Sequence, residues 1–143
     1  MFVRDIMTQQ PLAISPQTTL PDAMRLMKEH GFRRLPVLQH KKLVGIVTDR
    51  DLKEAMPSNA TSLSIWELNY LLSKLEVREI MQNPVFTVTE NMFVQDAAKL
   101  MLEKKIGGLP VMNKGILTGV ITVTDVLKAF VEKEVEKERG SHV

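Results

Sequence analysis

The sequence predicts an α/β fold in which one structural unit occurs twice. A shift of 77 − 3 = 74 residues aligns the segment 3–55 with the segment 77–129 without a gap. Both segments contain apolar runs of strand length between stretches that have the spacing of amphipathic helices. The chain has 143 residues, of which 44% are hydrophobic and 25% charged, as is typical of a folded globular protein. We therefore expect two similar units with the element order β-α-β-β-α.

The duplication extends over the whole unit. Residues that repeat with the same or a similar side chain include Val3/Val77, Ile6/Ile80, Met7/Met81, Asp22/Asp96, Leu26/Leu100, Met27/Met101, Pro36/Pro110, Gly45/Gly119, Thr48/Thr122 and Asp51/Asp125. A period of this length is too long for a solenoid repeat, so a tandem pair of small units is expected.

The first repeat begins with a short predicted strand at 13–15. A helix follows from Thr19, because a proline lies early and an acid in its first turn, and it ends at Gly31. The apolar runs 35–38 and 43–47 are separated by a polar turn and predict two paired strands.

The last helix of the first repeat starts immediately afterwards. Thr48 is followed three residues later by Asp51, which is the pattern of a capping box. The second repeat predicts the same elements, with a strand at 87–89, a helix from about 96 to 105 and a final helix that opens at Thr122.

Two further segments lie outside the repeats, which we place at 1–56 and 77–131. The linker 57–76 contains a polar loop and a helix that opens at Ser64, and its apolar side chains recur at helical spacing. We expect this helix to pack on the core; a surface that docks a partner is the alternative. The tail 132–143 lies within a stretch that begins at 131, and the alternating charges at 131–139 predict an exposed helix able to pair with another subunit.

Composition excludes several classes of protein. The absence of cysteine rules out disulfides, zinc–thiolate sites and cysteine nucleophiles. No apolar run is long enough to span a membrane, and the N-terminus does not resemble a secretory signal, so a cytoplasmic location is expected. A net charge of +2 is too small to indicate a nucleic-acid-binding surface.

Recognisable catalytic motifs are also missing. The chain has no phosphate-binding loop, dinucleotide fingerprint, nucleophile elbow or zinc-protease motif. Its histidines, His30, His40 and His142, have no second ligand at metal-binding spacing. We therefore expect no catalytic residues, no metal site and no required cofactor.

The pattern Gly-h-h-Thr-x-x-Asp, with h apolar, occurs in both repeats, at 45–51 and 119–125. One interpretation is that the pattern does no more than cap a helix. Alternatively, a helix start with free N–H groups, a hydroxyl and a carboxylate can hold a phosphate and a ribose together. The carboxylate would then face the sugar, and the cations that offset the phosphate would be Arg33, Arg34 and Arg50.

These motifs carry a family resemblance. The order h-x-x-h-Pro-Val, a short turn and Gly-h-h-Thr-x-x-Asp, found twice, resembles a tandem pair of CBS domains, the Bateman module. The linker 65–72 and the segment 77–81 further resemble acetoin-utilisation (AcuB-type) CBS proteins. The resemblance implies two α/β units packed through their sheets with pseudo-two-fold symmetry, clefts that bind adenosine compounds, and a homodimer.

The resemblance also implies which residues bind the ligand. In one site these are Leu12, Ala13, Arg34, Leu35, Pro36, Thr48 and Asp51. In the other they are Phe86, Thr87, Gly108, Leu109, Pro110, Thr122 and Asp125. Glycines replace the paired arginines in the second repeat, so we expect the first site to favour phosphorylated adenosine.

The function expected from this sequence is a regulatory module without catalysis. The module would bind AMP, ADP or ATP, with S-adenosylmethionine and NAD-type ligands also open, and would signal to a protein that the sequence does not identify. Neither nucleic acid nor a membrane is an expected partner. The alternative is a constitutive dimerisation scaffold that has no physiological nucleotide ligand.

Overall fold

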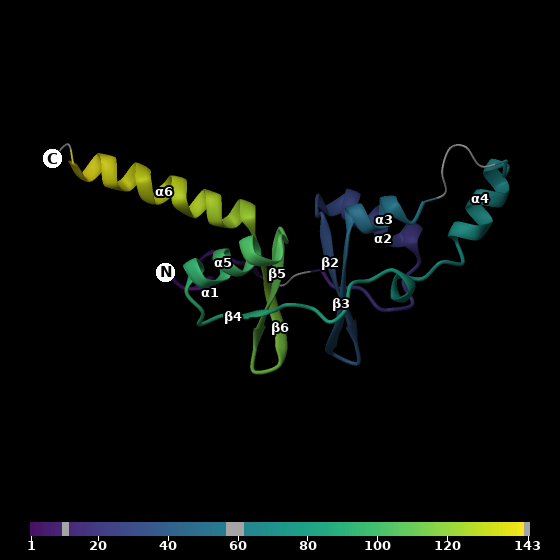
Figure 1. The fold of residues 1–143 in the computed structure, drawn as a ribbon, viewed down its shortest axis with the longest axis horizontal. Helices are drawn as coiled ribbons and strands as arrows, with labels where there is room; N and C mark the ends of the chain where they lie inside the picture. The colour runs from purple at the N-terminus through teal and green to yellow at the C-terminus, as the bar shows by residue number, and fades with distance from the viewer. Residues whose placement is uncertain (10–11, 57–61, 142–143) are drawn as a thin grey trace. The chain divides into compact units, whose positions relative to one another are not determined.

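The computed structural model describes residues 1–9, 12–56 and 62–141 and divides the chain into two compact units (Figure 1). Unit 1 comprises residues 1–11 and 86–143, and unit 2 comprises residues 12–85. The boundaries of the units therefore differ from those of the sequence repeats. Each repeat contributes its first segment to the unit that is formed mainly by the other repeat.

Unit 2 contains a two-stranded antiparallel sheet. Its elements are α2 (Leu20–His30), β2 (Arg34–Gln39), β3 (Lys42–Thr48), α3 (Asp49–Glu54), α4 (Ile65–Leu72) and the 3₁₀ helix η1 (Val77–Glu79). Two bridges extend the sheet, because Ile14 pairs in parallel with Val37 on β2 and Gln82 pairs antiparallel with Ile46 on β3. Four chain segments thus lie side by side.

Unit 1 repeats this arrangement with longer outer strands. Its elements are α1 (Val3–Ile6), β1 (Thr8–Gln9), β4 (Val88–Thr89), α5 (Val94–Lys104), β5 (Gly108–Asn113), β6 (Ile116–Thr122) and α6 (Val123–Ser141). The sheet has the order β1-β6-β5-β4, in which only the β4–β5 pair is parallel. The α/β class and the duplication expected from the sequence are confirmed.

At the 74-residue shift, each buried residue in the core of unit 1 has a counterpart in the core of unit 2. The core of unit 2 contains Ile14, Ala23, Met27, Leu35, Val37, Val47 and Val77, and the core of unit 1 contains Val88, Ala97, Met101, Leu109, Val111, Ile121 and Val3. Val3 and Val77 are both fully buried, at 0% exposure. Each therefore completes the core of the unit built mainly from the other repeat.

Helix α2 begins and ends where the sequence predicted. The hydroxyl of Thr19 accepts a hydrogen bond from the N–H of Asp22 at 3.3 Å, and Gly31 ends α2 in the left-handed conformation. Lys105 takes the same conformation at the end of α5, with φ of 56°. Helix α5 begins at Val94, two residues before the expected start.

Other expectations need correction. The predicted strand 13–15 is reduced to a bridge at Ile14, and the sequence did not predict α1 or η1. The C-terminal segment is helical as expected, but it continues the last helix of the repeat as one helix, α6 (Figure 1). None of the helices described is both long and apolar enough to cross a membrane.

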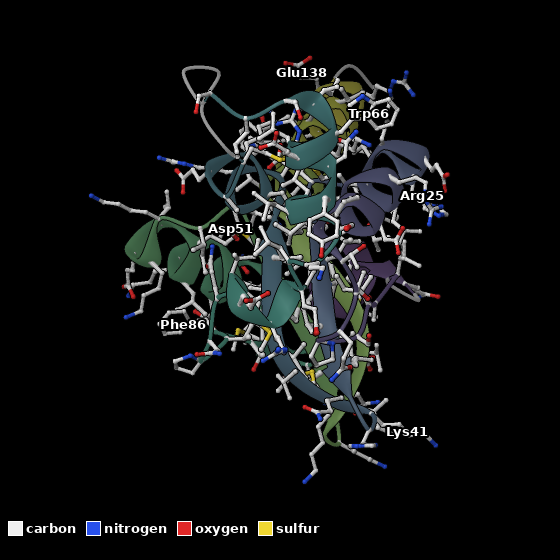
Figure 2. All side chains as sticks on the ribbon, turned by 90° about the vertical axis from the view of Figure 1, so that its right-hand side faces the viewer. Arg25, Lys41, Asp51, Trp66, Phe86 and Glu138 are labelled. Carbon is white, nitrogen blue, oxygen red and sulfur yellow. The ribbon has the colours of Figure 1, made fainter. Side chains whose placement is uncertain are left out.

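Helix α4 does not pack on the core, contrary to expectation. It begins at Ser64, whose hydroxyl accepts from the N–H of Glu67 at 3.2 Å. None of its residues is buried, and Trp66, which is labelled in Figure 2, is 80% exposed. The contact with the core is made instead by Leu75, beyond the end of the helix.

Candidate functional site

In unit 2, the repeated motif lies where β3 passes into α3. The hydroxyl of Thr48 accepts a hydrogen bond from the N–H of Asp51 at 3.1 Å, and the N–H of Thr48 donates to Oδ2 of Asp51 at 2.9 Å. This reciprocal capping box fixes the hydroxyl and the carboxylate next to each other at the end of the sheet. Both side chains are half-buried.

Unit 1 has the same arrangement at the junction of β6 and α6. The N–H of Thr122 donates to Oδ2 of Asp125 at 2.8 Å, and the N–H of Asp125 donates to the Thr122 hydroxyl at 3.2 Å. That hydroxyl also donates to Oδ2 of Asp125 at 3.0 Å. The repeated motif therefore forms the same local structure twice.

The neighbouring strand brings several expected site residues to the motif in unit 2. Arg34 opens β2 directly opposite Thr48, and the buried Leu35 and Pro36 follow it. Leu12 and Ala13 are half-buried and lead into Ile14, whose N–H donates to the carbonyl of Pro36 at 3.0 Å.

The corresponding residues of unit 1 lie in the same register. Gly108 is opposite Thr122 and is followed by the buried Leu109 and Pro110. Phe86 and Thr87 are exposed and directly precede β4. The ammonium group of Lys104 lies 4.8 Å from the centre of the Phe86 ring, so Phe86 presents one face to a cation.

Two of the three arginines expected to offset a phosphate, Arg50 and Arg33, have contacts other than with Thr48 and Asp51. The Arg50 guanidinium forms an exposed ion pair with Glu54 at 3.0 Å. Arg33 lines a hollow of about 470 Å³ between α2 and α3, with Met24, Phe32 and Leu52. Neither Thr48 nor Asp51 lines this hollow. Of the three arginines, Arg34 is the one paired in register with the motif.

The start of α3 does not offer the free N–H groups that the sequence suggested. The N–H of Asp49 donates to the carbonyl of Arg33 at 2.8 Å, and the N–H of Arg50 donates to Oδ1 of Asp49 at 2.9 Å. The N–H of Asp51 is held by Thr48. These donors are satisfied within the protein, so the helix start alone does not form a phosphate site.

Sequence reasoning missed the segment that crosses the motif in each unit. In unit 2, the side chain of Gln82 donates from Nε2 to Oδ1 of Asp51 at 3.2 Å and to Oδ2 at 3.0 Å. The side chain of Met81 lies directly over Gly45, where an added Cβ would be 2.5 Å from its sulfur atom. In unit 1, Met7 covers Gly119 in the same way.

A signal for this contact is present in the sequence. A glycine opens the motif in both repeats, which indicates a close approach by another part of the chain. The aligned Ile-Met pairs at 6–7 and 80–81 are the segments that make the approach.

Comparison with known proteins identifies both repeats. The family model described as CBS domain matches residues 3–58 and 77–132. A putative acetoin utilization protein (AcuB) from Vibrio cholerae has a similar structure, with a TM-score of 0.79 and 31% sequence identity. The match covers 97% of this chain and 96% of that one.

Two other similar structures contain adenosine compounds. CBSX2, a CBS-pair protein from Arabidopsis thaliana, in complex with AMP matches with a TM-score of 0.76 and 32% identity over 93% of this chain and 98% of that one. The CBS domain pair of protein MJ0100, in complex with 5′-methylthioadenosine and S-adenosyl-L-methionine, matches with a TM-score of 0.77 and 27% identity over the same shares.

Curated relatives include longer proteins. The uncharacterized protein MJ1225 from Methanocaldococcus jannaschii is 32% identical over 136 residues, which cover 90% of this chain. The chain spans 46% of the length of that relative.

Proposed function

The chain belongs to the CBS-domain family as a tandem pair, and on this premise we propose that it is a regulatory module without catalytic activity. The module binds an adenosine-containing ligand and transmits the bound state to a protein partner. AMP, ADP and ATP are the first candidates, and S-adenosylmethionine and NAD-type compounds share the same nucleoside.

The observation that carries this proposal is the paired geometry of the repeated motif. In each unit a threonine hydroxyl and an aspartate carboxylate are fixed together beside a buried Leu-Pro-Val strand. The carboxylate is an acceptor suited to sugar hydroxyls, and the apolar strand suits an adenine ring. Arg34 gives the site of unit 2 a cation for a phosphate group, whereas Gly108 gives none in unit 1.

The ligand class is supported by two similar proteins. CBSX2 is described in complex with AMP, and the MJ0100 pair with 5′-methylthioadenosine and S-adenosyl-L-methionine. These ligands share adenosine and differ in their charged groups, so the adenosine portion is the part of the ligand that we extend to this chain.

Signalling requires contact with another protein, and we propose homodimerisation as part of it. Exposed apolar side chains on α4 and α6 supply surfaces for such contacts; they are Ile65, Trp66, Tyr70, Leu71, Val123, Leu127, Phe130, Val131 and Val135. Light scattering on the purified protein tests the dimer. A monomer at micromolar concentration contradicts it.

A constitutive scaffold is the alternative function, and one observation favours it. Each threonine and aspartate pair already satisfies the start of its own helix, as expected of residues that serve only as caps. A scaffold of this kind would have the same stability with and without nucleotides.

The experiment that separates these functions is a thermal unfolding series with AMP, ADP, ATP, S-adenosylmethionine, NADH and GMP. A ligand at one hundred times its dissociation constant stabilises one site by about 2.7 kcal/mol, which raises the melting temperature by several degrees. We expect a rise with at least one adenosine compound and none with GMP.

Variants then locate the binding. Asp51→Ala and Asp125→Ala each remove one carboxylate, and we expect at least one of them to abolish the thermal shift. A chain whose melting temperature is the same with every adenosine compound contradicts the regulatory function and favours the scaffold.

A further inference from the structure

The Asp51 carboxylate in unit 2 already has a side-chain partner. The amide nitrogen of Gln82 lies 3.2 Å from Oδ1 and 3.0 Å from Oδ2 of Asp51, which is labelled in Figure 2. Oδ2 also accepts from the backbone of Thr48 at 2.9 Å. One amide group therefore spans both oxygens that a ligand would use.

The backbone of Gln82 is held firmly in this position. Its N–H donates to the carbonyl of Ile46 at 2.8 Å, and its carbonyl accepts from the N–H of Ile46 at 3.1 Å. Met81 packs over Gly45 immediately before it. The side chain itself is exposed, so the amide can leave the carboxylate without disturbing the core.

Unit 1 lacks this contact. The 74-residue shift places Thr8 at the position of Gln82, and Thr8 pairs with Val120 just as Gln82 pairs with Ile46. Among the residues that the structure describes, no hydrogen bond joins the Thr8 side chain to Asp125. Within the described part of the chain, the Asp125 carboxylate is held by Thr122 alone, through their shared capping box.

The difference has a chemical consequence for ligand binding. Two neighbouring sugar hydroxyls donate best to both oxygens of one carboxylate, as a bidentate pair. In unit 2 the Gln82 amide occupies this position, so the hydroxyls must displace it. In unit 1 the Asp125 Oδ1 atom receives no donor from the described residues.

We propose that Gln82 lowers the affinity of the site on Thr48 and Asp51 by competing with the ligand's sugar hydroxyls for the Asp51 carboxylate. This inference rests on the proposed function, because it assumes that Asp51 binds the sugar. It identifies Gln82 as the residue that makes the two sites unequal, independently of the arginines.

The test measures AMP binding by calorimetry at one site at a time. In an Asp125→Ala background, Gln82→Thr installs the residue that unit 1 has at this position. The variant removes the hydrogen bond from Gln82 that competes with the ligand for the charged Asp51 carboxylate. Because this bond is exposed to solvent and therefore modest in strength, we expect AMP to bind about 3- to 10-fold more tightly. 2′-Deoxy-AMP, which lacks one of the two hydroxyls, should gain much less.

Two controls accompany this variant. Gln39→Thr makes the same chemical change at the far end of β2 and should leave AMP affinity unchanged. The reverse exchange, Thr8→Gln in an Asp51→Ala background, should weaken AMP binding at unit 1. This second pair also provides the test if Asp125→Ala fails to fold.

The outcomes separate the two proposals. If the unaltered protein does not bind AMP, the proposed function with this probe fails, and the role of Gln82 fails with it. If AMP binds but its affinity is unchanged or weaker in Gln82→Thr, the role of Gln82 alone is overturned. A weaker affinity would show that Gln82 contacts the ligand directly.

Discussion

At the scale of single residues, the two glycines that open the motif differ in what lies above them. A Cβ at Gly45 would be 2.5 Å from the sulfur of Met81 and 3.2 Å from the carbonyl oxygen of Gln82. A Cβ at Gly119 would be 2.7 Å from both the sulfur of Met7 and the carbonyl oxygen of Thr8. A methionine side chain can move aside, whereas a backbone carbonyl within a strand cannot do so without breaking its pairing.

We therefore expect Gly119→Ala to destabilise the protein more than Gly45→Ala. Overpacking of this kind costs about 1–3 kcal/mol, and the larger value belongs to Gly119. Urea unfolding of both variants measures the difference. Adding Met81→Ala to Gly45→Ala should recover stability, whereas adding Met7→Ala to Gly119→Ala should recover less. Equal costs for the two glycines would contradict this account.

The local part of the candidate site could be predicted from the sequence at this scale. Thr48 and Asp51 are three residues apart, so their capping box depends only on local geometry. The contact of Gln82 with Asp51 spans 31 positions and depends on which segment crosses β3. That information lies in the tertiary fold, and only the glycine in the motif indicated that some segment comes close.

At the scale of elements, corresponding helices of the two units end with different residues in the same backbone conformation. Gly31 ends α2 with φ of 68°, and Lys105 ends α5 with φ of 56°. Glycine adopts this left-handed conformation without steric cost, whereas a lysine side chain is strained there. The second repeat thus has a less stable helix end.

Lys105→Gly should stabilise the protein by about 1 kcal/mol, because it removes this strain. Thermal and urea unfolding both measure the gain. Lys104→Gly, one residue earlier, is the matched control: it places glycine inside the helix and should destabilise by a similar amount. A loss of stability in Lys105→Gly would show that the lysine side chain contributes more than its backbone costs.

Element types were largely predictable, and element surroundings were not. The strands β2 and β3 and the start of α4 follow from apolar runs and a cap that the sequence displays. The exposure of Trp66 does not follow, because helical spacing of apolar residues shows that a face is apolar but not what covers it.

At the scale of the whole chain, the repeats exchange their first segments. Val3 lies in the core formed by 88–121, and Val77 lies in the core formed by 14–52. Aligning the repeats shows that these valines are equivalent, but it does not show which core each one enters. An alignment is the same whether each segment packs on its own repeat or on the other.

The swap of first segments between the repeats predicts which unit a core substitution destabilises. Val3→Ala removes two buried methyl groups from unit 1 and should cost about 2 kcal/mol, including the cavity. Amide hydrogen exchange should then become faster in α5, β5 and β6, which are far from residue 3 in sequence. In β2 and β3 it should remain as slow as in the unaltered protein. Val77→Ala should give the opposite pattern. A core defect favours local opening of the unit to which the altered residue belongs. Faster hydrogen exchange in β2 and β3 for Val3→Ala would therefore contradict the assignment of the first segment to unit 1.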